Sequence, residues 1–390
     1  MSLTMSRPVP DPDHRPGIAV EKLAPGFALV LMLACMCVHA DALAAEDAHK
    51  IDAAIESIRA EGATPFVAVA ITTAGNMCHS GHYGEARQSP SSPPPKFHAA
   101  SISKLLTATV IMQLQDEGKL SIDDPVSKYE PMFANSPIKL VDLLTHTSGL
   151  RDHAHADARH ERQQVDSYIG ALAKQSLVRR PGGHWYYSDA GYNLLGRVVE
   201  RITGRPFADA MRERLLEPLG MHDSDFDIAR ISADSRLTAF DKRGRPVPHP
   251  WDIAFLPSSG LQTTAEDLAK FARAILTISA SPDVRIPIDA DALSDMTRVR
   301  IATEWDGIGQ GLGWQIASSE LGPQWRHAGS ERGFEGLLTL YPDKGFAIVV
   351  LGNRADWPRF ELEKKLSRLF ADASTGCTGR IKNPVEQRVN

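Results

Sequence analysis

Strand-like segments occur at both ends of this chain of 390 residues, while helix-like segments fill its middle. Residues 65–73 run apolar and β-branched, and an Ala-Gly-Asn turn separates them from a second predicted strand at 77–85. Residues 193–202 and 265–278 have the clearest helical periodicity. Four more strands are predicted near the C-terminus, at 311–317, 324–328, 336–341 and 346–351. The simplest architecture is therefore α+β: one antiparallel sheet built from both ends of the chain and flanked by helices, with a mostly helical lobe inserted.

The same patterns divide the chain into parts. The predicted parts are a targeting segment at 1–45, a folded domain at 46–374 made of a sheet lobe (about 47–98 and 285–374) and a helical lobe (about 101–280), and a C-terminal tail at 375–390. Helices with one apolar face are expected at 47–61 and 357–373. A domain of this length can bury a large core without metal ions or disulfides to stabilise it.

The first 45 residues have the features of an export signal. Basic residues precede an apolar run at 27–40, and Ala42-Leu43-Ala44 offers a cleavage site. A run of 14 residues is shorter than the roughly 20 that a membrane-spanning helix needs. We therefore predict an exported protein, periplasmic or secreted, with no membrane span after cleavage. The alternatives are a buried N-terminal helix and a lipid anchor on Cys35, and Met32 makes the lipid-attachment motif imperfect.

Two cysteines, Cys78 and Cys377, remain outside the apolar run. In an oxidising compartment they could form a disulfide. The alternative is a pair of free thiols, because the sequence cannot show whether their Cα atoms come close enough. Both alternatives stay open.

The segment Ser101-Ile102-Ser103-Lys104 is the first candidate for chemistry. Residues i and i+3 share a helix face, so the ammonium group of Lys104 can reach the hydroxyl of Ser101. The positive end of the helix also favours negative charge that develops near Ser101. Taken alone, the pattern is more often a helix cap followed by a surface lysine.

Two later motifs change that interpretation. A loop at 181–189 contains Tyr187-Ser188-Asp189, and His327-Ala328-Gly329-Ser330 ends a predicted strand. Together with Ser101 and Lys104, these elements resemble the serine hydrolase family that includes class C β-lactamases, DD-peptidases and β-lactamase-like esterases. The resemblance covers roughly residues 48–370. Further signatures agree with it, at 120–126, 143–150 and 259–268.

The resemblance implies a β-lactamase/transpeptidase-like fold and a role for each motif residue. Ser101 would attack a carbonyl and form an acyl-enzyme, and Lys104 would keep its charge beside it or relay its proton. Tyr187 would act as general base. His327 would hold a substrate carboxylate or help to transfer protons. The backbone N–H groups of Ser101 and Ser330 would form the oxyanion hole.

Two positions depart from the family pattern. Asp189 stands where the family most often has asparagine, and an ionised carboxylate accepts hydrogen bonds but cannot donate them. Asp189 could therefore pair with Lys104 and keep that lysine charged. His327 stands where class C β-lactamases have lysine, and a mostly neutral imidazole suits the carboxylate of a β-lactam less well. A dedicated β-lactamase is therefore a weaker prediction than a peptidase or an esterase.

Composition excludes other classes of function. The net charge is −5 and no long basic block occurs, so a nucleic-acid partner is not expected. A segment from Asp152 to His160 is rich in histidine, but it lacks catalytic zinc spacing and is interpreted as a solvated loop. No metal or cofactor is predicted, and the expected partner is a small-molecule or peptide substrate.

The resulting hypothesis is a serine hydrolase that acts on a D-amino-acid peptide or an ester. The alternatives are a β-lactamase, and a non-catalytic protein that keeps the fold to bind peptidoglycan fragments or to act as a sensor. Non-catalytic members of such families usually lose the nucleophile or the lysine. Ser101 and Lys104 are both present, which favours the enzyme.

Overall fold

The computed structural model describes residues 46–85, 93–152, 162–250, 252–281, 287–373, 377 and 380–381. The predicted export signal, its cleavage site and Cys35 lie outside these residues, as does most of the histidine-rich segment after Asp152. Within the described residues, no helix is long and apolar enough to cross a membrane.

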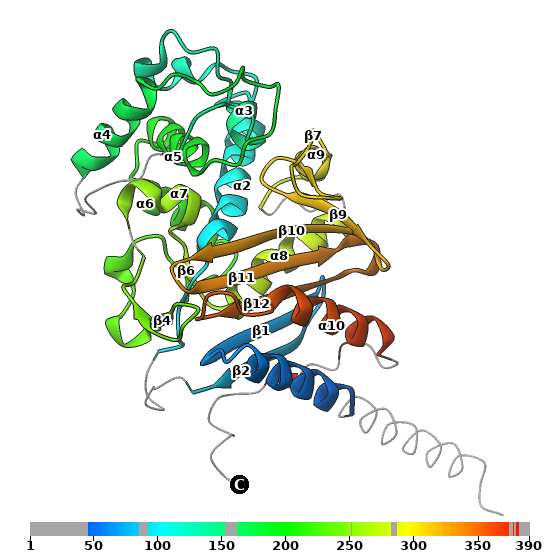
Figure 1. Ribbon diagram of the computed structural model, residues 1–390. Helices are drawn as coiled ribbons and strands as arrows, with labels where there is room; N and C mark the ends of the chain where they lie inside the picture. Colours follow the sequence, from blue (N-terminus) through cyan, green and yellow to red (C-terminus); the bar gives the residue numbers. More distant parts are fainter. Residues whose placement is uncertain are drawn as a thin grey trace, which may run out of the picture. The chain divides into compact units, whose positions relative to one another are not determined.

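A nine-stranded sheet is built from both ends of the chain, as the sequence predicted (Figure 1). Its strands, in spatial order, are β13 (Arg380–Ile381), β2 (Met77–Gly84), β1 (Phe66–Thr73), β12 (Phe346–Gly352), β11 (Phe334–Tyr341), β10 (Gly322–Glu331), β9 (Gln315–Ser319), β8 (Gly309–Gln310) and β7 (Ile301–Ala302). Neighbouring strands are antiparallel, except for β13, which pairs in parallel with β2. Two small two-stranded sheets are formed by β3 (Phe97–His98) with β6 (Gln262–Thr263), and by β4 (Ala239–Phe240) with β5 (Pro246–Val247).

The central strand β1 is apolar along most of its length because both of its faces are buried. Phe66, Ala68 and Ala70 belong to one core, which also includes residues of α8 (Ala265–Ala280). The alternate residues of β1 belong to a second core, formed with the helix at 46–61 and with α10 (Arg359–Asp372). Figure 1 shows α8 behind the sheet and α10 in front of it. The α+β prediction is confirmed.

The helical lobe lies between the N-terminal and C-terminal strands in the sequence. Its helices are α2 (Ser103–Asp116), α3 (Leu140–Leu144), α4 (Arg162–Ala173), α5 (Asp189–Thr203), α6 (Phe207–Met211) and α7 (Leu256–Ser259). Helix α9 (Ala290–Thr297) follows the lobe in the sequence. Single turns of 3-10 helix are η1 (Ala100–Ile102), η2 (Val126–Lys128), η3 (Pro131–Phe133), η5 (Ile228–Arg230), η6 (Ala233–Ser235), η7 (Ile253–Phe255) and η8 (Pro342–Lys344), and η4 (Arg212–Leu216) is a short π-helical segment. Helix α2 is buried on nearly all sides, which agrees with its largely apolar sequence. The catalytic candidates at its N-terminus are therefore held on a rigid element.

Three features differ from the sequence-based expectation or extend it. The strand predicted at 311–317 starts only at Gln315, because residues 311–314 form a turn in which Gly313 has a φ of 83°. The two-residue strands β7 and β8 were not predicted. Helix α8 ends the segment expected to form the helical lobe, yet it packs on the sheet against β1 and β12.

Cys78 and Cys377 form a disulfide, with their Cα atoms 4.7 Å apart. This resolves the choice that the sequence left open. Cys78 lies on β2, and the following short strand β13 pairs Arg380 with His79 of the same strand. The C-terminal segment is thus attached to the sheet both by a covalent bond and by strand pairing.

Candidate active site

Ser101 lies in the turn η1, between the short strand β3 and the buried helix α2. Ala100 has a φ of 48°, a left-handed conformation that is unfavourable for a residue with a side chain. This turn redirects the chain into α2. Strand β10 passes directly beside the turn. The approach is so close that a Cβ atom on Gly329 would lie 2.2 Å from the carbonyl oxygen of Ala99. Only glycine permits this approach, which brings the end of β10 to the turn that contains Ser101.

Lys104 is completely buried, and its ammonium group has three oxygen partners. Nζ donates to Ser101 Oγ at 3.0 Å, to Asp189 Oδ1 at 2.5 Å and to the carbonyl oxygen of Ser258 at 3.0 Å. These partners come from η1, α5 and α7, so three separate elements converge on one nitrogen. A buried cation requires such pairing.

The charge on Lys104 depends on Asp189. Burial alone would lower the pKa of Lys104, but Asp189, with a smaller contribution from Tyr187, outweighs burial and raises the pKa above its ordinary value. Asp189 is the first residue of α5, and its side chain is 28% exposed. The ion pair that the sequence analysis considered for Asp189 is therefore present.

Tyr187 lies on the loop before α5, with its ring 4.9 Å from the Lys104 ammonium. Burial raises the pKa of the Tyr187 hydroxyl, while the charge of Lys104 and hydrogen bonding with Lys104 and Ser101 act in the opposite direction. The ring of His146 stacks on Tyr187, with the ring centroids 4.4 Å apart. At neutral pH the free protein therefore carries a neutral phenol beside a lysine cation.

His327 is buried on β10, with its ring 6.5 Å from that of Tyr187. Burial, reinforced by the charge of Lys104, lowers the pKa of His327 to about 3. Nδ1 donates to the carbonyl oxygen of Ala328 at 2.8 Å, which leaves Nε2 as an acceptor. Among the described residues, Nε2 has no hydrogen-bond partner. The imidazole is thus neutral and has a free acceptor.

The end of β10 presents an unpaired edge. Strand β9 pairs with β10 only as far as Arg326, so residues 327–331 have a strand partner on one side alone, namely β11. Ser330 lies on this stretch and is exposed. The five motif residues Ser101, Lys104, Tyr187, Asp189 and His327 are gathered where this edge meets the start of α2, and the connected contacts described above link them.

Sequence reasoning missed several participants. His146 belongs to the signature at 143–150, but nothing in the pattern assigned it a partner. It has a φ of 58° and accepts a hydrogen bond at Nδ1 from the backbone N–H of Ser188. Ser258 contributes only a backbone carbonyl, which carries no side-chain signal. Asp152 accepts from the Ser188 hydroxyl and from the Ala190 backbone N–H, both at 2.9 Å, and so holds the start of α5.

An aromatic cluster borders Tyr187. Trp305 lies on the loop between β7 and β8, and its ring centroid is 4.7 Å from that of the buried Trp185 and 5.8 Å from that of Tyr187. Trp305 is 41% exposed, so its indole offers an apolar surface to solvent beside the site. Hydrogen bonds to Thr303 and Ile308 hold the loop in place. No sequence pattern had singled out this residue.

The described residues contain no group of three or more His, Cys, Asp or Glu side chains that could hold a metal ion. The chemistry available from the described side chains is instead that of a hydroxyl group next to a buried ammonium ion and a phenol. This arrangement is suited to acyl transfer through a serine.

Comparison with known proteins gives a family for the whole folded region. The family model described as β-lactamase matches residues 51–373. The chain is 30% identical over 277 residues to penicillin-binding protein 4 of Amycolatopsis lactamdurans, which covers 66% of this chain and 72% of that protein. It is 26% identical over 344 residues to the D-alanyl-D-alanine-carboxypeptidase/endopeptidase AmpH of Escherichia coli, with 82% and 86% covered. It spans only 61% and 62% of the length of two further relatives.

Solved structures agree with the fold. The octameric penicillin-binding protein homologue from Pyrococcus abyssi superposes with a TM-score of 0.70 and 27% sequence identity, covering 82% of this chain and 76% of that one. This protein therefore shares its sheet with an inserted helical lobe with that penicillin-binding protein homologue.

Proposed function

The chain belongs to the β-lactamase family of serine hydrolases, and from this premise we propose that Ser101 is its acylated nucleophile and that its substrate is a D-amino-acid peptide or an ester. The catalytic domain in this proposal is residues 46–374. The observation that carries it is the hydrogen bond of 3.0 Å between the buried Lys104 ammonium and the Ser101 hydroxyl. A fully buried lysine is rare unless it is paired, because its charge is costly to remove from water, and here the paired ammonium group also contacts the Ser101 hydroxyl.

The proposed reaction has two steps. Acylation starts from the minor population in which Tyr187 has lost its proton to solvent. The Ser101 oxygen then bonds to the substrate carbonyl carbon while its proton passes to that phenolate, and Tyr187 delivers this proton to the departing amine or alcohol as its bond to the carbonyl carbon breaks. In deacylation, water attacks the acyl carbon, its proton passes to Tyr187, and Ser101 regains a proton as it leaves. The Lys104 cation stabilises the negative charge on Tyr187 and Ser101 throughout.

The end of β10 would complete the site. Backbone N–H groups of Ser101 and Ser330 would stabilise the oxyanion, an effect typically worth about 10²- to 10³-fold in rate per donor. The unpaired edge at 327–331 supports this role, because it leaves backbone groups available to a ligand. His327 would accept a hydrogen bond from the substrate at Nε2, the atom that has no partner among the described residues.

The substrate class follows from charge and surface. A neutral His327 supplies no cation for a substrate carboxylate, which disfavours efficient hydrolysis of β-lactams and, by the same argument, of peptides cleaved next to a free C-terminal carboxylate. The exposed Trp305 beside Tyr187 favours a substrate with an apolar group. AmpH, a relative of this chain, is a D-alanyl-D-alanine carboxypeptidase and endopeptidase, which supports the peptide as one of the two substrate types. A peptide and an ester would both react with Ser101 by acyl transfer.

Export is the remaining part of the proposal. The disulfide between Cys78 and Cys377 supports it, because disulfides persist in oxidising compartments and are rare in the cytosol. The apolar run at 27–40 with its cleavage site supports it independently. Detection of the mature protein in the periplasmic or secreted fraction, beginning near residue 45, would test it. Retention of the full chain in the cytosol would contradict it.

The decisive experiment compares three substrates with the mature protein: a short-chain p-nitrophenyl ester, a D-alanyl-D-alanine peptide and nitrocefin. A fluorophosphonate probe measures labelling of the nucleophile in parallel. Ser101→Ala is the test variant, and Ser57→Ala, on the exposed face of the helix at 46–61, is the matched control. We expect the unaltered protein and Ser57→Ala to hydrolyse the ester or the peptide and to be labelled by the probe. Ser101→Ala should show neither turnover nor labelling.

The outcomes separate the alternatives. Labelling that survives Ser101→Ala would disprove the assignment of the nucleophile. Tight binding of peptidoglycan fragments without turnover of any substrate would favour the non-catalytic protein. Nitrocefin turnover at the rate of a dedicated β-lactamase would favour the second candidate function, which the family match supports and the neutral His327 opposes.

A further inference from the structure

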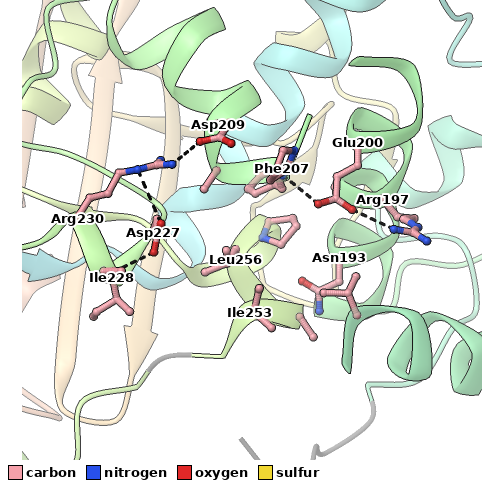
Figure 2. Close-up of a pocket in the computed structure, with 17 residues that line it drawn as sticks. Asn193, Arg197, Glu200, Phe207, Asp209, Asp227, Ile228, Arg230, Ile253 and Leu256 are labelled. Atoms are coloured by element: carbon pink, nitrogen blue, oxygen red, sulfur yellow. Dashed lines mark hydrogen bonds and ion pairs between the residues drawn. The ribbon is translucent and has the colours of Figure 1, made fainter. Parts of the chain in front are cut away.

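A second cavity lies within the helical lobe, apart from the residues that carry the proposed chemistry. Its volume is about 480 Å³, within the range of small-molecule sites. The walls come from α4, α5, α6, η5 and the segment that leads through η7 into α7 (Figure 2). None of Ser101, Lys104, Tyr187 or His327 lines it.

The walls are apolar at the base and charged at the sides, but the charges are already paired. Phe207 and Leu256, both buried, contribute apolar surface. Arg197 is paired with three carboxylates, and so is Arg230. Figure 2 shows the pairing of Arg230 with Asp209 across one side of the cavity. A charged ligand would have to compete with these ion pairs, so the walls favour a neutral one.

One polar atom in the wall has no partner. Asn193 is 2% exposed, and its Nδ2 donates to the hydroxyl of Tyr168 at 3.0 Å. Its Oδ1 has no hydrogen-bond partner among the described residues. Figure 2 shows the Asn193 carboxamide on the side of α5 that faces Ile253 and Leu256. A buried acceptor without a donor is unfavourable, and a ligand hydroxyl in the cavity would satisfy it once the Asn193 carboxamide turns toward the cavity, because Oδ1 is closed to solvent in the free structure.

The same wall is connected to the catalytic lysine through α7. The side chains of Leu256 and Pro257 line the cavity, while the carbonyl oxygens of Pro257 and Ser258 accept hydrogen bonds from α2. Thr107 Oγ1 donates to the first at 2.7 Å, and Lys104 Nζ donates to the second at 3.0 Å. Helix α7 thus lies between the cavity and Lys104.

Helix α5 provides a second connection. Gly196 packs so closely on α7 that a Cβ atom there would lie 2.0 Å from Pro257 Cγ. The same helix begins with Asp189, the carboxylate partner of Lys104. A ligand that shifts α7 would therefore also press on the helix that holds Asp189, because closely packed interiors transmit displacement.

We propose that this cavity is a second binding site for a neutral, mostly apolar small molecule with a hydroxyl group, and that its occupation slows catalysis through α7. We expect the rate to fall rather than rise, because Lys104 in the free structure already has its three oxygen partners within hydrogen-bond distance. A displacement of α7 can only weaken that arrangement. The kinetic part rests on the proposed function, whereas the binding part does not.

Binding is tested by titration calorimetry with 2-naphthol, and with its methyl ether as the ligand that lacks the donor. We expect one molecule of 2-naphthol to bind per protein chain, with the same affinity for Ser101→Ala. Asn193→Leu should lower the affinity for 2-naphthol about tenfold but should change the affinity for the methyl ether less than twofold. Ala229→Trp, at an exposed position of the cavity lining, should abolish binding. Ala134→Trp, exposed and outside the lining, is the matched control.

The coupling is tested by ester hydrolysis. Saturating 2-naphthol should lower kcat at least threefold with KM changed less than twofold, and it should have no effect on Ala229→Trp. Absence of binding up to millimolar ligand, or binding that Ala229→Trp leaves unchanged, would overturn the site. Binding without a change in kcat would overturn the coupling. An enzyme with no measurable turnover would overturn the proposed function instead, and the calorimetry would still decide the site.

Discussion

Replacing Asp189 with asparagine tests how the buried Lys104 keeps its charge. The change preserves shape but removes the negative partner that lies 2.5 Å from the completely buried Lys104 ammonium. Loss of one partner of a buried ion pair typically costs about 3–5 kcal/mol. Water reaches Asp189, whose side chain is 28% exposed, so we expect the lower end, about 3 kcal/mol.

The loss should depend on pH in a defined direction. In the unaltered protein the pKa of Lys104 is raised, so its favourable contribution is present below the ordinary lysine pKa and is lost only as the pH rises above that range. In Asp189→Asn, burial becomes the dominant influence and lowers the pKa of Lys104. The unfolded chain then holds the proton more tightly, so the deficit should shrink as the pH rises, by up to about 1.4 kcal/mol per pH unit.

Urea unfolding followed by tryptophan fluorescence at pH 7 and pH 9.5 measures both effects. For a urea m value of about 3 kcal/mol/M, the midpoint at pH 7 should fall by about 1 M. Asp295→Asn is the matched control, because the partners of Asp295 within the described part of the chain are the exposed Arg298 and the half-buried Arg300. It should cost at most about 1 kcal/mol. Equal losses for the two variants, or a deficit in Asp189→Asn that is unchanged at pH 9.5, would refute the reasoning.

Three further predictions concern activity. Because the pKa of Tyr187 is raised, kcat/KM for an ester should rise continuously from pH 5 to pH 9, and His327, whose pKa is lowered to about 3, should add no step in this range. A value of kcat/KM that does not change with pH between 5 and 7 would contradict a phenolate base. Gly329→Ala would place a Cβ atom 2.2 Å from the Ala99 carbonyl oxygen, so labelling of the nucleophile by a fluorophosphonate should slow at least tenfold while far-ultraviolet circular dichroism stays unchanged. Trp305→Ala should raise KM for phenylacetyl esters about tenfold, which corresponds to the loss of about 1.4 kcal/mol of apolar contact, and should change KM for acetyl esters less than twofold. Equal changes in KM for both kinds of ester would show that Trp305 does not contact the substrate.

The sheet was predictable because its strands carry two-sided or alternating apolar patterns. Strand β1 is apolar on both faces, and the apolar segments predicted at 336–341 and 346–351 form the antiparallel pair β11 and β12. Strands β7 and β8 have two residues each, too short for any periodicity to appear. The start of β9 was misplaced because Gly313 adopts a positive φ, which a sequence pattern does not reveal.

The site was predictable only where side chains carry the signal. The spacing of Ser101 and Lys104 anticipated their hydrogen bond, and the carboxylate at Asp189 suggested its ion pair. The carbonyl of Ser258 could not be foreseen, because every residue has one. Neither could the pKa of His327, since a sequence does not show how deeply a side chain is buried.

The bond between Cys78 and Cys377 spans 299 residues, nearly all of the folded domain. A single cut in the backbone anywhere between them would therefore leave two fragments that still migrate as one molecule until a reductant is added. The fragments would also re-associate as one chain does, independent of protein concentration. Cleavage of an exposed loop would then cut the backbone of this protein without separating Ser101 from strand β10.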